Sequence, residues 1–387
     1  MKATLSYVLV TPYAISKSRT GGILSRLLSR TSLDLVGAQM FAADRAFAEK
    51  YAQALRERSP KGRPATLADY VEREFAPGKD GRPRCAMLLL FRGDDPCARL
   101  SSVCGDVGDW RGETPGGTIL DTYGDLVFSP ENPDEIAHFE PAALTPRNQR
   151  EADGDLRMMA DFLDGAANAA GGLSPAAPPG VERTLVIIKP DNWTFHSARP
   201  GAIMDMFSCT GLDIADVKIH RFSLAQALDF YGPVEEMLRK KLSGVFGKRA
   251  AGILGREFGV SVSERTANAI AETFGAECAG NEFAGLVEFM CGKRPGACPK
   301  EDLEKPGDAK CMILVYEGAN AVAKIRDALG PTNPADAPDG TVRREFGQSV
   351  MVNAAHASDS AESFLRERAI VKMGENTLAA IIRESLG

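Results

Sequence analysis

Short apolar runs alternate with helix-like segments along the first 130 residues of the chain. The runs at residues 5–10, 33–40 and 86–91 are rich in aliphatic and aromatic side chains, which predicts buried β-strands. Helices are expected at about 22–29, 43–56 and 96–103, and a further strand near 118–128. Leu156, Met159, Phe162 and Leu163 share one helical face, so residues 145–163 should form a helix that packs by this stripe.

The second half of the chain repeats this order. Residues 185–188 and 213–222 read as strands around a helix at 202–210, and residues 283–290 and 312–316 continue the core. The order β-α-β-β-α-β is that of a ferredoxin-like domain. The predicted fold class is therefore α+β, with two tandem ferredoxin-like βαββαβ domains whose antiparallel sheets carry helices packed on them.

Local matches support an internal repeat. The stretch from Leu5 to Thr11-Pro12 aligns with the stretch from Leu185 to Lys189-Pro190, and Gly105 then falls on Gly330. We expect a first domain at 1–145, a helix and an Ala/Gly/Pro-rich linker at 146–180, and a second domain at 181–387. The second domain has insertions at about 233–281, with helix-like runs at 234–242 and 262–274, and at 292–310.

Composition narrows the functional classes. A net charge of -6 over 387 residues argues against general attraction to nucleic acid or membranes, although a local basic cleft stays open. No apolar run approaches a membrane span, and the first residues lack a signal-peptide core, so a cytoplasmic location is expected. The eight cysteines form no Cys-x-x-Cys pair, which favours free thiols over a zinc site; a bridge between Cys291 and Cys298 is the alternative.

One histidine stands out near the C-terminus, in Asn353-Ala354-Ala355-His356-Ala357-Ser358-Asp359-Ser360. It follows a strand-like run at 347–352 and precedes a helix-like run at 362–371, which Asp359 and Glu362 would cap. A neutral imidazole nitrogen on such a tight turn can act as a nucleophile, and Glu367 could hold the other nitrogen. The alternative is a loop histidine that hydrogen-bonds its own turn.

This stretch resembles the active-site turn of nucleoside diphosphate kinases, Asn-x-x-His-Gly-Ser-Asp-Ser. Further family motifs stand upstream in the same order, and the resemblance covers roughly residues 181–371. They are Ile187-Ile188-Lys189-Pro190-Asp191, Val315-Tyr316-Glu317-Gly318-Ala319-Asn320 followed by Arg326, and Gly330-Pro331-Thr332-Asn333-Pro334 leading to Gly340-Thr341-Val342-Arg343.

The resemblance implies a γ-phosphate transfer from a nucleoside triphosphate to a nucleoside diphosphate, by ping-pong kinetics through phosphorylated His356. It implies His356, Lys189 and Glu367 as catalytic residues. It implies nucleotide contacts from Lys189, Tyr231, Arg326, Thr332, Arg343 and Asn353. Mg²⁺ would arrive with the phosphates rather than in a protein cage. A homo-oligomer built from pseudo-dimeric chains is expected as the assembly.

Plainer interpretations stand beside some of these roles. Tyr231 could be a ring at the core edge, and Glu367 an exposed carboxylate that pairs with Arg366 or Arg368. His220 is expected to be structural and His196 to lie on the surface.

In this alignment the first copy lacks the residues that would bind phosphate and carry out catalysis. Thr11, Ser101 and Leu120 stand where Lys189, Arg326 and Arg343 stand in the second copy, and His138 is out of register. Losing three cations removes most of the charge neutralisation that a polyphosphate needs. An inactive structural copy is the simplest interpretation, with a repurposed binding site as the alternative.

The second copy also departs from the family. Ala357 replaces the usual glycine, and Glu282 stands where the family places the phenylalanine that stacks on the base. Two alternatives to the kinase therefore stay open: phosphohistidine transfer to a different acceptor, and a non-catalytic nucleotide-binding or scaffold protein. The basic run of Arg239, Lys240 and Lys241 in the insert is expected to be a solvated helix face.

Overall fold

The computed structural model describes residues 3–58, 63–79, 81–106, 116–132, 135–165, 180–375 and 377–387. Most of the predicted linker, at 166–179, lies outside the described residues. The chain divides into two compact units. The first, here called the sheet unit, comprises residues 1–219, 312–365 and 372–387. The second, here called the hairpin unit, comprises residues 220–311 and 366–371.

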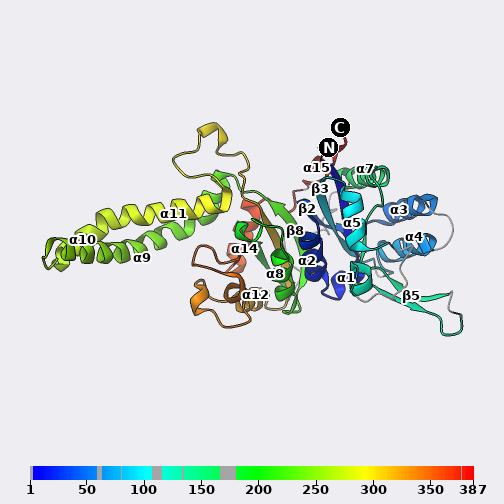
Figure 1. Ribbon diagram of the computed structural model, residues 1–387, viewed down its shortest axis with the longest axis horizontal. Helices are drawn as coiled ribbons and strands as arrows, with labels where there is room; N and C mark the ends of the chain where they lie inside the picture. The colour runs from blue at the N-terminus through cyan, green and yellow to red at the C-terminus, as the bar shows by residue number, and fades with distance from the viewer. Residues whose placement is uncertain are drawn as a thin grey trace. The chain divides into compact units, whose positions relative to one another are not determined.

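Two four-stranded antiparallel sheets form the framework of the sheet unit (Figure 1). The first has the order β2-β3-β1-β6, from strands β1 (Thr4–Val10), β2 (Asp34–Ala42), β3 (Cys85–Gly93) and β6 (Ala143–Leu144). The second has the order β10-β7-β9-β8, from β7 (Glu182–Ile188), β8 (Asp213–His220), β9 (Cys311–Gly318) and β10 (Ala355–Ala357). Numbered within each half, both sheets have the order 4-1-3-2, so the α+β ferredoxin-like fold is confirmed.

Local details repeat between the two halves as well. Helix α5 (Pro96–Cys104) begins after Asp95 at φ 46° and ends at Gly105, whose φ is 87°. Helix α12 (Ala321–Leu329) begins after Asn320 at φ 57° and ends at Gly330, with φ 82°. Both terminal glycines lie against a threonine hydroxyl, where a Cβ would approach to 2.7 Å. A side chain at either glycine would meet both a left-handed backbone and this contact.

The remaining elements of the sheet unit cover the two sheets. Its helices are α1 (Pro12–Ser16), α2 (Thr20–Arg30), α3 (Arg45–Arg58), α4 (Arg63–Glu74), α6 (Ile119–Tyr123), α7 (Gln149–Gly165), α8 (Arg199–Ser208), α13 (Val342–Phe346) and α15 (Leu378–Leu386). A separate two-stranded sheet pairs β4 (Asp125–Phe128) with β5 (Ile136–Glu140). Short 3₁₀ turns lie at Pro190–Asn192 and Pro334–Asp336. Helix α14 (Ala361–Ile370) begins in this unit and ends in the other.

One apolar core runs through both halves of the sheet unit. Alternate residues of β1 and β7, such as Val8 and Val186, join the same buried cluster with residues of α2 and α8. Helices α2 and α8 meet backbone to backbone, because a Cβ on Gly21 would lie 2.5 Å from the Asp205 nitrogen and one on Gly201 would lie 2.3 Å from the Ser25 nitrogen. The opposite face of the first sheet is covered by α3, α4, α7 and α15.

Two sequence expectations in this unit are corrected. Residues 347–352 form no strand, because the amides of Gln348 and Ser349 both donate to the Val352 carbonyl and close a turn. The strand expected at 118–128 is helix α6 followed by β4, since the Thr118 hydroxyl and Asp121 form a capping box. Helices α4 and α15 and the β4–β5 pair were not predicted.

The hairpin unit is mainly a pair of long helices (Figure 1). Helix α9 (Leu224–Phe258) returns through α10 (Glu264–Ile270), a π-helical turn (Ala271–Gly275) and α11 (Ala276–Cys291). The separate helix predicted at 234–242 is wrong, because α9 begins with a capping box at Ser223 and continues through Pro233 for 35 residues. A short 3₁₀ turn at Lys300–Asp302 lies in the loop predicted at 292–310.

The cysteine expectation holds: all eight thiols are free. Within the described part of the chain, no helix is long and apolar enough to cross a membrane.

Candidate active site

His356 lies in strand β10, opposite Ile187 of β7, and not on the tight turn that the sequence suggested. The turn is one step earlier, at Ala354, whose φ of 68° is left-handed. Its carbonyl accepts a hydrogen bond from the Lys189 amide at 2.9 Å. Pairing with the buried strand β7 therefore fixes the backbone of the half-buried His356.

Lys189 and Asn353 form a buried pair beside this strand. The Lys189 Nζ donates to Asn353 Oδ1 at 2.7 Å and to the Met351 carbonyl at 3.3 Å. Burial lowers the pKa of Lys189 to about 8, and the nearby charge of Arg343 adds to this effect. Asn353 Nδ2 donates to the carbonyls of Thr332 and Val350, so the asparagine holds the ammonium in place.

Arg343 also reaches this site. Its guanidinium donates from Nη1 to the Gly330 carbonyl at 2.9 Å and from Nη2 to the Ala355 carbonyl at 3.2 Å. The arginine therefore connects α13 to the strand that carries His356. Arg326 and Thr332 are both exposed, and the Thr332 carbonyl is tied to Asn353.

The charges of Arg326 and His356 both act on the carboxylate of Asp359. A hydrogen bond from the Ser363 hydroxyl lowers the pKa of Asp359, and the charges of Arg326 and His356 lower it further. Ser360, rather than Asp359, caps α14, because its hydroxyl accepts from the Ser363 amide at 3.0 Å. The capping box expected between Asp359 and Glu362 is corrected in this respect.

The backbone conformation at Ala357 explains why alanine can stand where the family has glycine. Ala357 is the last residue of β10 and is buried, with no left-handed φ. The backbone here therefore does not require glycine.

Asn192 is a positioning residue that the sequence reasoning missed. Its side chain donates to the carbonyls of Lys189 and Ala354, at 3.1 and 2.8 Å, and accepts from Arg199. It fixes both ends of the β7–β10 junction. Its place two residues after Pro190, at the end of a buried strand, was the available signal.

Glu367 and Tyr231 belong to the hairpin unit. Glu367 is 3% exposed, which corrects its interpretation as an exposed carboxylate, and its Oε1 lies 3.8 Å from Arg366. Tyr231 is buried in α9, with its ring 5.0 Å from that of Phe230. His220 is buried edge-on against Phe222, and His196 is exposed, as expected for both.

The strand register identifies the counterpart of His356 in the first half. Thr11 donates its amide to Ala142, as Lys189 does to Ala354, and Leu9 pairs with Leu144 where Ile187 pairs with His356. Leu144 therefore takes the place of the histidine. His138 lies in β5, opposite Val127.

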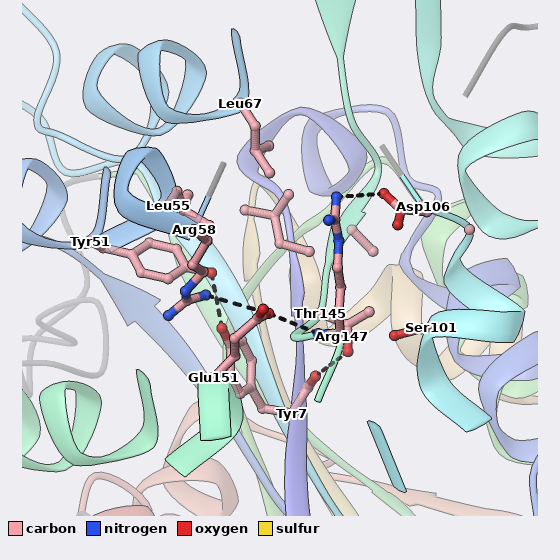
Figure 2. A pocket seen from close by; sticks show the side chains of 13 residues that line it. Tyr7, Tyr51, Leu55, Arg58, Leu67, Ser101, Asp106, Thr145, Arg147 and Glu151 are labelled. Carbon is pink, nitrogen blue, oxygen red and sulfur yellow. Dashed lines mark hydrogen bonds and ion pairs between the residues drawn. The ribbon is translucent and has the colours of Figure 1, made fainter. Parts of the chain in front are cut away.

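A pocket borders Leu144, and Figure 2 shows Tyr7 paired with Tyr51 and Arg58 paired with Glu151. Arg147 donates to Asp106 at 2.9 Å. Two residues that line the pocket also bind Asp155, whose buried carboxylate accepts from Tyr7 Oη at 2.7 Å and from both Nη atoms of Arg58. The arginines of this pocket are thus neutralised by acids of the same half.

The chain is similar to known nucleoside diphosphate kinases. A family model described as "Nucleoside diphosphate kinase" matches residues 301–375. The "Nucleoside diphosphate kinase" of Chlamydia pneumoniae is 31% identical over 183 residues, which are 47% of this chain and 85% of that protein. The chain belongs to the nucleoside diphosphate kinase family.

Other nucleoside diphosphate kinases match over the same share of the chain. The Campylobacter curvus (strain 525.92) protein is 30% identical over 187 residues, covering 48% of this chain and 92% of that protein. A solved NDP kinase from Pyrobaculum aerophilum is 27% identical over 49% of this chain and 94% of that one, with a TM-score of 0.34.

Proposed function

We propose that this chain is a nucleoside diphosphate kinase that moves the γ-phosphate of a nucleoside triphosphate to a nucleoside diphosphate. The observation that carries the proposal is the cluster at the β7–β10 junction. There the strand of His356, the buried Lys189–Asn353 pair and Arg343 are joined by hydrogen bonds. A histidine beside preorganised cations suits phosphoryl transfer, which depends on positioning and charge neutralisation.

In the proposed mechanism a neutral ring nitrogen of His356 attacks the γ-phosphorus. The N–P bond forms as the bond to the bridging oxygen breaks, and the nucleoside diphosphate leaves with that electron pair. A second nucleoside diphosphate then attacks the phosphohistidine and restores the free imidazole. Lys189, Arg326 and Arg343 would neutralise the phosphate oxygens, with the Thr332 hydroxyl as a further donor.

Three further residues have proposed roles. Glu367 would orient His356, and Tyr231 would contact the phosphates. Asn353 would contact the sugar, and its observed bond to Lys189 adds a positioning role.

A divalent cation fits this site as part of the nucleotide. Among the described residues no three histidine, cysteine or acidic side chains gather into a metal cage. Mg²⁺ would arrive with the nucleotide and would supply neutralisation of phosphate charge. The residues of this chain would bind the remaining phosphate oxygens.

The first half is proposed to be a non-catalytic copy, since Leu144 stands at the register of the histidine and Thr11 at that of Lys189. The division into domains at 1–145 and 181–387, the homo-oligomer and the cytoplasmic location stay predictions.

The test is incubation with γ-labelled ATP and Mg²⁺, followed by a chase with each nucleoside diphosphate. Wild type should carry acid-labile, base-stable label that chases into several triphosphates. His356→Ala should carry none, and the exposed His196→Ala should match wild type. Label that no nucleoside diphosphate removes would point to another acceptor. Absence of label from wild type would leave a nucleotide-binding or scaffold role.

A further inference from the structure

The hairpin unit separates positive and negative charge onto its two arms. Residues 233–258 of α9 carry six basic and three acidic side chains, a net charge of +3. Residues 264–291 of the returning arm carry one basic and five acidic side chains, a net charge of -4. Helices of opposite charge would ordinarily neutralise each other across their contact.

This neutralisation does not occur inside the hairpin. Within the described part of the chain, no ion pair joins α9 to the returning arm; Arg239 pairs with Glu235 of its own helix at 2.7 Å, and Glu288 pairs with Arg294. The two arms instead meet through small residues. A Cβ on Gly247 would lie 2.4 Å from Ala271, and one on Gly275 would lie 2.4 Å from the Ser243 carbonyl. The close approach leaves Lys241, Lys248, Glu272 and Glu277 exposed at the surface.

Large apolar side chains lie exposed among these charges. Met237 and Val245, 64% and 56% exposed, alternate along α9 with the exposed Lys241 and Lys248 at the spacing of one helical face. On the returning arm, Phe274 is 54% exposed between the exposed Glu272 and Glu277. Each arm thus presents an apolar centre flanked by charge of one sign, as interaction surfaces do.

We propose that the hairpin is a self-association surface, and that its occupant is the hairpin of a second copy of this chain. In a two-fold arrangement α9 of each chain faces the returning arm of the other, so lysines meet glutamates twice. Gly247 lies against Ala271 within one hairpin, so Lys241–Lys248 and Glu272–Glu277 lie at the same level along it. An anionic lipid surface or a nucleic acid would repel the acidic arm, which favours the second copy. The inference does not depend on the catalytic proposal.

The test is the dissociation constant of the full-length chain, measured by sedimentation velocity at low salt. We expect Lys241→Glu with Lys248→Glu, and separately Glu272→Lys with Glu277→Lys, to weaken one association step at least tenfold. An equimolar mixture of the two variants should restore it, because the reversed charges again complement each other. Lys17→Glu with Lys50→Glu, two exposed lysines of the sheet unit, is the control and should leave the association unchanged.

The mixture separates this proposal from simple misfolding, since a misfolded variant cannot be rescued by its partner. Wild type that stays a single chain at all concentrations would overturn the proposal. So would association that neither reversal weakens, which would belong to another surface. Monomeric protein that instead sediments with phosphatidylserine vesicles would assign the hairpin to a lipid surface.

Discussion

At the scale of single residues, the buried ammonium of Lys189 ties activity to pH. Burial holds its pKa at about 8, below the ordinary value of lysine, so free enzyme loses this cation as the pH rises through about 8. We expect kcat/KM for ATP to fall over that range. In the nucleotide complex the phosphates stabilise the protonated form, so kcat should decline only at higher pH.

Two substitutions of Lys189 test whether the loss of its charge causes the decline at alkaline pH. Lys189→Arg keeps its charge throughout and should remove the alkaline decline, even with a lower maximum. Lys189→Ala should lower kcat/KM about 100-fold, as loss of one preorganised donor does. A wild-type profile of kcat/KM that stays flat from pH 7 to 10 would contradict the assignment of Lys189 as the titrating group.

Asp155 in the first half predicts a stability effect without a direct catalytic one. Its carboxylate is fully buried and takes hydrogen bonds from Arg58 and Tyr7. Asp155→Ala leaves Tyr7 with only the Tyr51 hydroxyl and Arg58 with only Glu151, 4.0 Å away, so it should cost about 1–3 kcal/mol of unfolding free energy. Urea unfolding measures it, with the exposed Glu49→Ala as control. A loss below about 1 kcal/mol would show that the network contributes little.

At the scale of elements, the crossing of α2 and α8 depends on two glycines. Gly21→Ala and Gly201→Ala each place a methyl 2.3–2.6 Å from backbone atoms, which cannot move as a side chain can. Each should destabilise the sheet unit by about 1–3 kcal/mol. Gly154→Ala in α7 meets nothing within 4 Å and should be neutral or stabilising by up to about 1 kcal/mol. Thermal unfolding compares the three, and equal effects would contradict the tight crossing.

The strands and helices differ in how well the sequence predicts them. Strands β1, β3, β7 and β9 were predictable because buried strands are uniform apolar runs. Strand β10 was not, because three residues around His356 become a strand only by pairing with β7. The order of the motifs was enough to predict that Asn353 and Arg343 belong to the same site as Lys189. The role of Asn192, and the position of Leu144 where the second half has His356, could be seen only from the paired strands of the structure. Helix α15 was missed because its apolar face is explained only by the distant α7 and β2 that it covers.

At the scale of the molecule, the two sheets share one folding unit. The cluster that contains Val186 and Ile203 also contains Val8 and Leu24, and Leu378 and Ile382 of the C-terminal helix complete the core of the first half. Either half alone would therefore expose the part of its apolar surface that the other half covers. We therefore expect residues 1–165 and 180–387, expressed separately, to aggregate or to remain unfolded.

Co-expression should correct this defect, because the two fragments carry complementary faces of the same core. They should co-purify as a 1:1 complex that labels on His356, whereas the fragment 180–387 alone should show neither cooperative unfolding nor labelling. Gly201→Ala in the second fragment should weaken the complex, since its methyl meets the backbone of the first fragment at Ser25. A fragment 180–387 that folds and labels alone would show that the first half is dispensable. The equivalent strand positions of Leu144 and His356 would then reflect only the shared fold of the two halves. They would not indicate that the second half needs the first half to complete its core.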